Sequence, residues 1–367
     1  MAGKRGMEAV CNEVLSGEAG GELLRIDASG FRTTNSLSTN DSTGQRPASS
    51  GMERAPSPGA DVVLTIDCRI QRLAEQALEG ETGAVVVVDV ETGDVLAMAS
   101  VPGFDPNQFV PSISATNWNL LLQDPGRPLI NRTVAEIYPP GSVFKPVVAF
   151  AALEAGKAGE GTSFNCPGYY ALGQAKFRCW NINGHGTIAL HKAIEQSCNS
   201  YFCALGMQCG IGPIHQQAEA LGFGKKTGVE CDLESAGILP DDAWKRKVYH
   251  DGWRSGDTCN ISIGQGALAV TPLQVAMMVS AIANGGRLYR PHLIREIREN
   301  DGSRAVRRTD PELVRDLGWS PRTLKAVRGG MHDVIQAPEG TGQRARLDGI
   351  EMAGKTGTAE YGAKGQG

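Results

Sequence analysis

The sequence lacks any apolar run of about 18 residues, the length that a membrane-spanning helix needs. It also lacks a secretory signal, because residues 1–6 contain no apolar core. Strong charge of either sign is missing too: the formal net charge is −4 at pH 7, which gives no reason to expect a nucleic-acid partner. What remains is the composition of a globular protein. With 41% hydrophobic and 21% charged residues over 367 positions, the chain can hold one large domain and part of another.

A serine and a lysine three residues apart, Ser142 and Lys145, form the first motif that carries chemistry. On a helix such residues share one face, about 5–6 Å apart at Cβ, so the amine can reach the hydroxyl. Residues 139–141 (Pro-Pro-Gly) and the apolar run 147–153 predict a buried helix that begins close to Ser142. The lysine acts as a base only if burial or a neighbouring cation lowers its pKa, and Lys355 is a candidate for that cation. By itself, this spacing also occurs by chance.

The second motif is Ser197-Cys198-Asn199, which follows a helical stretch over 190–196. The Ser197 hydroxyl is a candidate proton relay, and the Asn199 amide is a candidate hydrogen-bonding group for a substrate. An ordinary helix cap is the alternative interpretation, because serine and asparagine favour such positions.

The third motif is Lys355-Thr356-Gly357, within a run of small residues over 352–359. We expect a strand there, since glycines allow a substrate backbone to approach closely. Lys355 and Thr356 are candidates to hold a substrate carboxylate. The amides of Thr358 and Ser142 are candidates for an oxyanion hole. A plain turn with a solvated lysine is the alternative.

The three motifs in this order are the S-x-x-K, S-x-N and K-T-G set of β-lactamases and penicillin-binding proteins, which open amide bonds through an acyl-serine. The chain resembles class B penicillin-binding proteins, specifically the elongation-type penicillin-binding protein 2 group. The resemblance extends beyond the motifs to the segments 138–146, 262–274, 283–286 and 354–360.

The resemblance implies an α+β chain with the penicillin-binding-protein/β-lactamase-like transpeptidase fold, an antiparallel sheet packed with helices beside a helical subdomain. It implies that residues 1–60 are the remnant of a non-catalytic pedestal plus a linker, and that residues 61–367 are the transpeptidase domain. The family's anchor helix, most of its pedestal and its C-terminal strands and helix are expected to lie outside this sequence.

Local patterns place several elements in that domain. Residues 61–66 predict a strand, and Asp67 can cap a helix whose apolar positions recur from 70 to 78. Residues 83–90 and 94–99 flank Glu91-Thr-Gly93 and predict a hairpin. We expect the Lys355 strand to join the same sheet. A long helix is predicted over 272–283, ending at the Asn-Gly-Gly of 284–286.

The function implied by the resemblance is a peptidoglycan D,D-transpeptidase that acts on stem peptides ending in D-Ala-D-Ala and is acylated by β-lactams. The implied partners are a SEDS-type glycosyltransferase and rod-complex proteins. The implied location is the cytoplasmic membrane of the bacterial cell envelope, facing the periplasm. A β-lactamase or D,D-carboxypeptidase shares the motifs, and a non-catalytic β-lactam-binding or scaffold protein is the alternative from another class.

Nine cysteines is a high number for an envelope protein, and an odd number cannot pair completely. Cys166, Cys179, His185 and Cys198 offer three thiols and one imidazole, a closed ligand set for structural zinc. Their spacing alone is a weak signal, but the surrounding text resembles the zinc-binding segment of some penicillin-binding protein 2 members. The alternatives are a Cys166–Cys179 disulfide, or four unlinked buried side chains.

Overall fold

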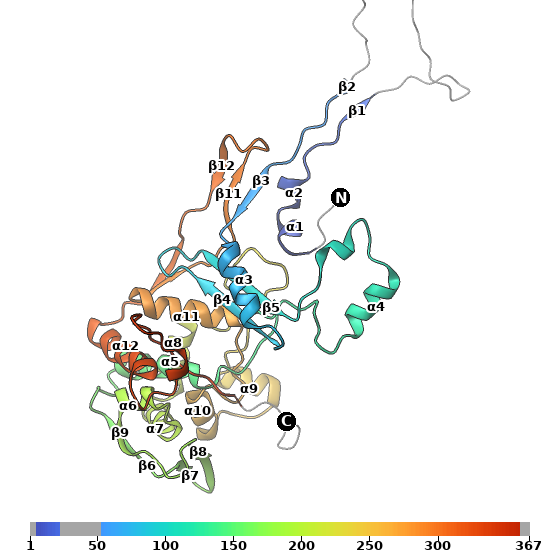
Figure 1. The fold of residues 1–367 in the computed structure, drawn as a ribbon. Helices are drawn as coiled ribbons and strands as arrows, with labels where there is room; N and C mark the ends of the chain where they lie inside the picture. Colours follow the sequence, from blue (N-terminus) through green and yellow to red (C-terminus); the bar gives the residue numbers. More distant parts are fainter. Residues whose placement is uncertain (1–4, 23–52, 360–367) are drawn as a thin grey trace, which may run out of the picture. The chain divides into compact units, whose positions relative to one another are not determined.

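The structure is a computed structural model that describes residues 5–22 and 53–359. It combines helices with small antiparallel sheets, so the expected α+β class is confirmed. Contacts divide the chain into two units. The first takes in Met1–Leu64, Glu230–Asp232 and Ile294–Thr309, and the second takes in Thr65–Val229, Leu233–Leu293 and Asp310–Gly367. Figure 1 shows the elements coloured along the chain.

The first unit is built on a three-stranded antiparallel sheet. Its central strand β11 (Ile294–Arg298) pairs with β3 (Asp61–Leu64) on one side and with β12 (Ala305–Arg308) on the other. Cys11, Ile294 and Ile297 form its small buried core. The remaining elements are α1 (Gly6–Val10), α2 (Asn12–Leu15), β1 (Gly21–Glu22) and β2 (Glu53–Arg54). The strand predicted over 61–66 is therefore present, although it does not share a sheet with the predicted hairpin.

The second unit contains that hairpin, β4 (Gly83–Val88) paired with β5 (Val95–Val101). The helix α3 (Cys68–Ala77) packs against it, and the buried side chains of Ala74, Ala97 and Ala99 meet between them. The Asp67 side chain accepts hydrogen bonds from the N–H groups of Arg69 and Ile70, so the predicted cap is confirmed. The helix α11 (Pro272–Asn284) packs against β4 of this hairpin. It ends at Gly285, whose φ is +96°, as the Asn-Gly-Gly of 284–286 predicts.

A helical core fills the rest of the second unit. Its centre is α5 (Lys145–Glu154), which is buried over its first eight residues and contacts α7 (Asn199–Cys209), α8 (Ile211–Ala220) and α12 (Pro321–Gln336) (Figure 1). The helix α6 (Leu190–Glu195) packs against α12. Two antiparallel strand pairs lie between α5 and α6 in sequence: β6 (Ser163–Cys166) with β9 (Gly186–Ala189), and the hairpin of β7 (Tyr169–Leu172) with β8 (Ala175–Arg178).

The shorter remaining elements complete this unit. They are η1 (Pro106–Phe109), α4 (Ala115–Gln123), η2 (Gly141–Phe144), α9 (Asp242–Tyr249), α10 (Ser255–Ser262), β10 (Arg287–Tyr289), β13 (Leu313–Asp316) and η3 (Gln343–Ala345). None of the helices described over 5–22 and 53–359 combines the length and apolarity needed to cross a membrane.

The prediction of a strand around Lys355 is wrong for this structure. Residues 351–359 run without regular structure and have no ladder partner within the described chain. The physical reason lies in a contact with a distant residue. The Gly354 N–H donates to the Met331 carbonyl of α12 at 2.9 Å, so this part of the backbone bonds to a helix instead of a sheet edge.

Candidate active site

The nucleophile candidate Ser142 lies on the 3₁₀ turn η2, directly before the α-helix α5 that begins at Lys145. This turn is held by backbone contacts. Gly141 has φ +55°, and its N–H donates to the Gly264 carbonyl at 2.9 Å. A Cβ on Gly264 would lie 1.9 Å from the Gly141 oxygen, so the two backbones are too close for any side chain there. Ser142 itself is partly exposed on this turn.

Lys145 is fully buried, and its amine faces the second motif. Nζ donates to the Ser197 carbonyl at 2.7 Å, to Ser197 Oγ at 3.2 Å and to Asn199 Oδ1 at 2.7 Å. An ammonium has three donors, so these contacts saturate it. Burial lowers the pKa of Lys145 to about 8. Among the described residues no hydrogen bond joins Ser142 to Lys145, since the three contacts of the amine go to Ser197 and Asn199.

Ser197 is the point at which the two lysines meet. Its hydroxyl accepts from Lys355 Nζ at 2.8 Å as well as from Lys145. Its backbone has φ +53°, a left-handed conformation that is unusual for serine and typical of functional sites. The cap interpretation does not hold for this residue: Gln196 ends α6 and Cys198 caps α7. With both lysines donating, the Ser197 proton is free to point elsewhere.

The pKa of Lys355 is lowered further than that of Lys145, the other amine that contacts the Ser197 hydroxyl. Burial and then the charge of Lys145 lower the pKa of Lys355 to about 7. We expected Lys355 to lower the pKa of Lys145. In the structure burial lowers the pKa of Lys145, and the charge of Lys145 adds to the lowering of the Lys355 pKa.

The residues after Lys355 lie against the nucleophile's turn. A Cβ on Gly357 would lie 2.7 Å from Val143 Cγ2, and one on Gly141 would lie 2.5 Å from the Thr358 oxygen and 3.3 Å from its nitrogen. The backbone N–H groups of Ser142 and Thr358 therefore belong to adjoining segments, as the oxyanion-hole hypothesis needs. The Thr356 hydroxyl is 2.8 Å from that of Thr341.

Asn199 links this centre to the cysteine cluster. Its Oδ1 accepts from Lys145, and its Nδ2 donates to the Arg178 carbonyl at 2.9 Å. Arg178 directly precedes Cys179, and Asn199 directly follows Cys198. The amide is thus held between the lysine and the loop that carries two of the proposed metal ligands.

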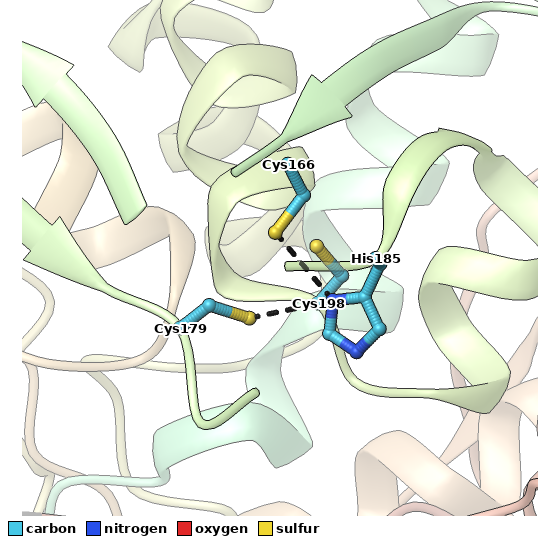
Figure 2. A group of neighbouring side chains, drawn as sticks. All are labelled: Cys166, Cys179, His185 and Cys198. Carbon is cyan, nitrogen blue, oxygen red and sulfur yellow. Dashed lines mark hydrogen bonds between the residues drawn. The ribbon is translucent and has the colours of Figure 1, made fainter. Parts of the chain in front are cut away.

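The predicted ligand set is brought together in space. The donor atoms of Cys166, Cys179, His185 and Cys198 all lie within 4.8 Å of one another (Figure 2). The three cysteines are at most 3% exposed, and all nine cysteines are free thiols. The thiol of Cys198 hydrogen-bonds to that of Cys179 and keeps the Cys179 pKa below its ordinary value.

The two distances from His185 match those between ligands of a tetrahedral metal. His185 Nδ1 is 3.5 Å from Cys166 Sγ and 3.6 Å from Cys179 Sγ. Ligands at the usual Zn–S and Zn–N lengths, at tetrahedral angles, are about 3.5 Å apart. Figure 2 shows Nδ1 facing the thiols of Cys166 and Cys179. The other ring nitrogen, Nε2, is buried with no hydrogen-bond partner among the described residues. The chemistry and spacing of the four side chains fit a zinc ion.

Sequence reasoning missed three residues that support the site. Gly264 sets the close approach to Gly141, Gln265 Nε2 donates to the Thr358 oxygen at 3.4 Å, and Thr341 contacts Thr356. The first two stand in the segment 262–274 that carries the family resemblance, but their contacts with distant residues leave no pattern in the sequence. Thr341 lies between two glycines, and nothing local marks it.

Similarity to known proteins agrees with this geometry. The family model described as the penicillin binding protein transpeptidase domain matches residues 83–367. The chain belongs to this transpeptidase family. The peptidoglycan D,D-transpeptidase MrdA of Acinetobacter baumannii is 36% identical over 370 residues, covering 100% of the chain and 52% of that protein.

Solved structures agree. The chain resembles penicillin-binding protein PBP2 in its complex with MreC from Helicobacter pylori, with a TM-score of 0.84 and 34% identity over 98% of this chain and 63% of that one. It also resembles the penicillin G acyl-enzyme of penicillin-binding protein A from M. tuberculosis, with a TM-score of 0.71 and 30% identity over 84% and 69% of the two chains. The expected transpeptidase fold is confirmed. The chain spans about half the length of the curated relatives it matches.

Proposed function

We propose that the protein to which this chain belongs is a peptidoglycan D,D-transpeptidase that works through an acyl-enzyme on Ser142. The observation that carries the proposal is the hydroxyl of Ser197, shared by the amines of Lys145 at 3.2 Å and Lys355 at 2.8 Å. This arrangement supplies a base, a proton relay and a cation beside the turn that holds the nucleophile. The MrdA relatives, which carry the name peptidoglycan D,D-transpeptidase, support the same reaction.

The proposed acylation proceeds on a stem peptide that ends in D-Ala-D-Ala. Neutral Lys145 takes the proton of the Ser142 hydroxyl while the Ser142 oxygen bonds to the penultimate carbonyl carbon of the peptide. The negative oxygen that forms is held by the N–H groups of Ser142 and Thr358. The C–N bond then breaks, and the leaving nitrogen receives its proton through Ser197 from a lysine.

The roles of the other groups follow from their contacts. Lys355 and Thr356 hold the terminal carboxylate, and Gly357 leaves space for the substrate backbone. Asn199, fixed by Lys145 and the Arg178 carbonyl, binds the substrate amide. An amine from a second stem peptide then takes the acyl group. A β-lactam presents a strained amide and a carboxylate in the same positions, so it acylates Ser142.

We further propose that Cys166, Cys179, His185 and Cys198 hold structural zinc. Four protein ligands leave no open position, so the ion supplies rigidity and no step of the reaction. The chain's own residues transmit this rigidity: Cys198 stands between Ser197 and Asn199, and Arg178 beside Cys179 accepts from the Asn199 amide. The site would keep Asn199 aligned with Lys145.

Location and partners are inferred from the relatives. We propose that the whole protein acts at the cytoplasmic membrane, on its periplasmic side, with residues 61–367 as the catalytic domain and 1–60 as part of a pedestal and linker. A solved relative forms a complex with MreC, and another comes from a peptidoglycan synthase complex that couples polymerization and crosslinking. We propose corresponding partners here, a rod-complex protein and a SEDS-type glycosyltransferase.

The test is cross-linking by the full-length protein supplied with a donor peptide ending in D-Ala-D-Ala and an acceptor amine. We expect D-Ala release with formation of the cross-linked product, and loss of both in Ser142→Ala. D-Ala release without cross-linked product would instead identify a carboxypeptidase. Many turnovers of the chromogenic cephalosporin nitrocefin would identify a β-lactamase, and a stable acyl adduct without either product would favour a binding protein.

A further inference from the structure

Thr341 contacts two separate parts of the proposed site. Its Oγ1 lies 2.8 Å from the Thr356 hydroxyl, and both its Oγ1 and its N–H are 3.4 Å from the Glu195 carbonyl. Thr356 belongs to the proposed carboxylate-binding motif. Glu195 ends α6, two residues before Ser197, and a carbonyl in the last turn of a helix has no partner within that helix. Thr341 thus joins the segment of Lys355 to the segment of Ser197.

The backbone on each side of Thr341 is fixed against α12. A Cβ on Gly340 would lie 2.3 Å from the Asp333 oxygen, and one on Gly342 would lie 2.7 Å from Ile335 Cδ1. The Gly342 N–H also donates to the Val334 carbonyl at 2.8 Å. Because these contacts involve backbone and buried side chains, the position of the Thr341 hydroxyl is set by the fold.

A threonine hydroxyl has one proton, and the Thr341 hydroxyl has two acceptors within reach. If it donates to the Glu195 carbonyl, it must accept the proton of Thr356, and the Thr356 oxygen then presents only lone pairs to a substrate. If it donates to Thr356, over the shorter distance, the Thr356 proton is free for a substrate carboxylate. Only the second arrangement attracts an anion.

We propose that Thr341 is a positioning residue that orients the Thr356 hydroxyl, so that its proton is donated to the carboxylate of the substrate. This inference rests on the proposed function, since it assumes that Thr356 binds the carboxylate. It adds a requirement that the three motifs do not contain. Beside the charge of Lys355, the preference for carboxylate-bearing ligands depends on a donor at position 341.

The test compares acylation of the full-length protein by benzylpenicillin and by its methyl ester, in which the carboxylate is masked. Thr341→Val keeps the shape of the side chain and removes its hydroxyl, whereas Thr341→Ser keeps the hydroxyl and removes the methyl group. Thr323→Val is the matched control. Thr323 is a buried threonine on α12 whose hydroxyl accepts from the Ser320 hydroxyl at 2.9 Å. Rates are read by intact-mass spectrometry, and melting temperatures are measured for every variant.

We expect Thr341→Val to slow acylation by benzylpenicillin about tenfold, the effect of one hydrogen bond to a charged group. Acylation by the ester should change little, and Thr341→Ser and Thr323→Val should stay near the wild-type rate. The proposal is overturned if Thr341→Val reacts with benzylpenicillin at the wild-type rate, if acid and ester slow equally, or if Thr341→Ser is as impaired as Thr341→Val. A wild-type protein that takes up neither compound refutes the proposed function itself, and this inference with it.

Discussion

Replacing Gly264 by alanine should disable the nucleophile without touching any reacting group. The new Cβ would lie 1.9 Å from the Gly141 oxygen, whereas nonbonded carbon–oxygen contacts need about 3.2 Å or more. The two backbones must therefore separate by about 1 Å, and Gly141 directly precedes Ser142. A displacement of that size in a reacting group costs about 10²-fold in rate. We expect acylation by a fluorescent penicillin to slow by about that factor.

Gly266 offers a matched control in the same loop. It has φ +79° against +70° for Gly264, so an alanine at either position carries the same left-handed strain of about 1–2 kcal/mol. A Cβ on Gly266 would meet the Asn260 side chain at 3.2 Å, and no backbone of the nucleophile's turn. Gly266→Ala should lose stability but keep an acylation rate close to that of the wild type.

The assay follows fluorescent penicillin bound per protein against time, at temperatures well below the melting temperature of each variant. The reasoning is refuted if Gly264→Ala and Gly266→Ala are acylated at equal rates. It is also refuted if Gly264→Ala melts like the wild type and reacts like it, since the close approach would then not position Ser142.

Further predictions address the lysines and the thiols. Ser197→Ala should slow acylation by about 10²-fold, as loss of a proton relay does, and Ser197→Gly, which relieves the positive φ, should not restore the rate. Acylation should rise with pH through about 8 as Lys145 loses its proton and becomes a base, and a pH-independent rate would contradict this. The pKa of Lys145 is about 8 in the folded protein and 10.5 for an unperturbed lysine, so between these values the unfolded chain binds a proton that the folded chain has lost. The free energy of unfolding, from denaturant titrations, should therefore rise with pH there, and less steeply in Lys145→Met, where only the lowered pKa of Lys355 still contributes. The purified protein should contain one zinc per chain by elemental analysis, lost in Cys179→Ala but kept in Cys209→Ala, another buried thiol; zinc retained in Cys179→Ala would contradict the assignment.

The local patterns predicted the elements whose signal lies within a few residues. The cap at Asp67, the hairpin of β4 and β5 and the glycine end of α11 are all present, because side chains within one turn decide them. The strand predicted at Lys355 is absent, because a strand depends on a partner that can stand anywhere in the sequence. In this structure the Gly354 N–H bonds to α12.

In the candidate site, too, the sequence predicted residue types but not contacts between distant residues. The motifs named the reacting groups because nucleophile, base and cation must be particular residue types. They did not show that the Lys145 amine is saturated by Ser197 and Asn199, nor that the pKa of Lys355 is lowered to about 7. These properties come from burial and from distances between residues far apart in the chain, which only the folded structure supplies.

The central claim is that Ser142 becomes acylated, and mapping the modified residue tests it most directly. The full-length protein is incubated with benzylpenicillin and digested, and the peptide that carries the penicilloyl mass is sequenced by tandem mass spectrometry. The account predicts one adduct on Ser142 and none in Ser142→Ala. An adduct on Ser197 or any other residue of the wild type, or an unchanged adduct in Ser142→Ala, would contradict it.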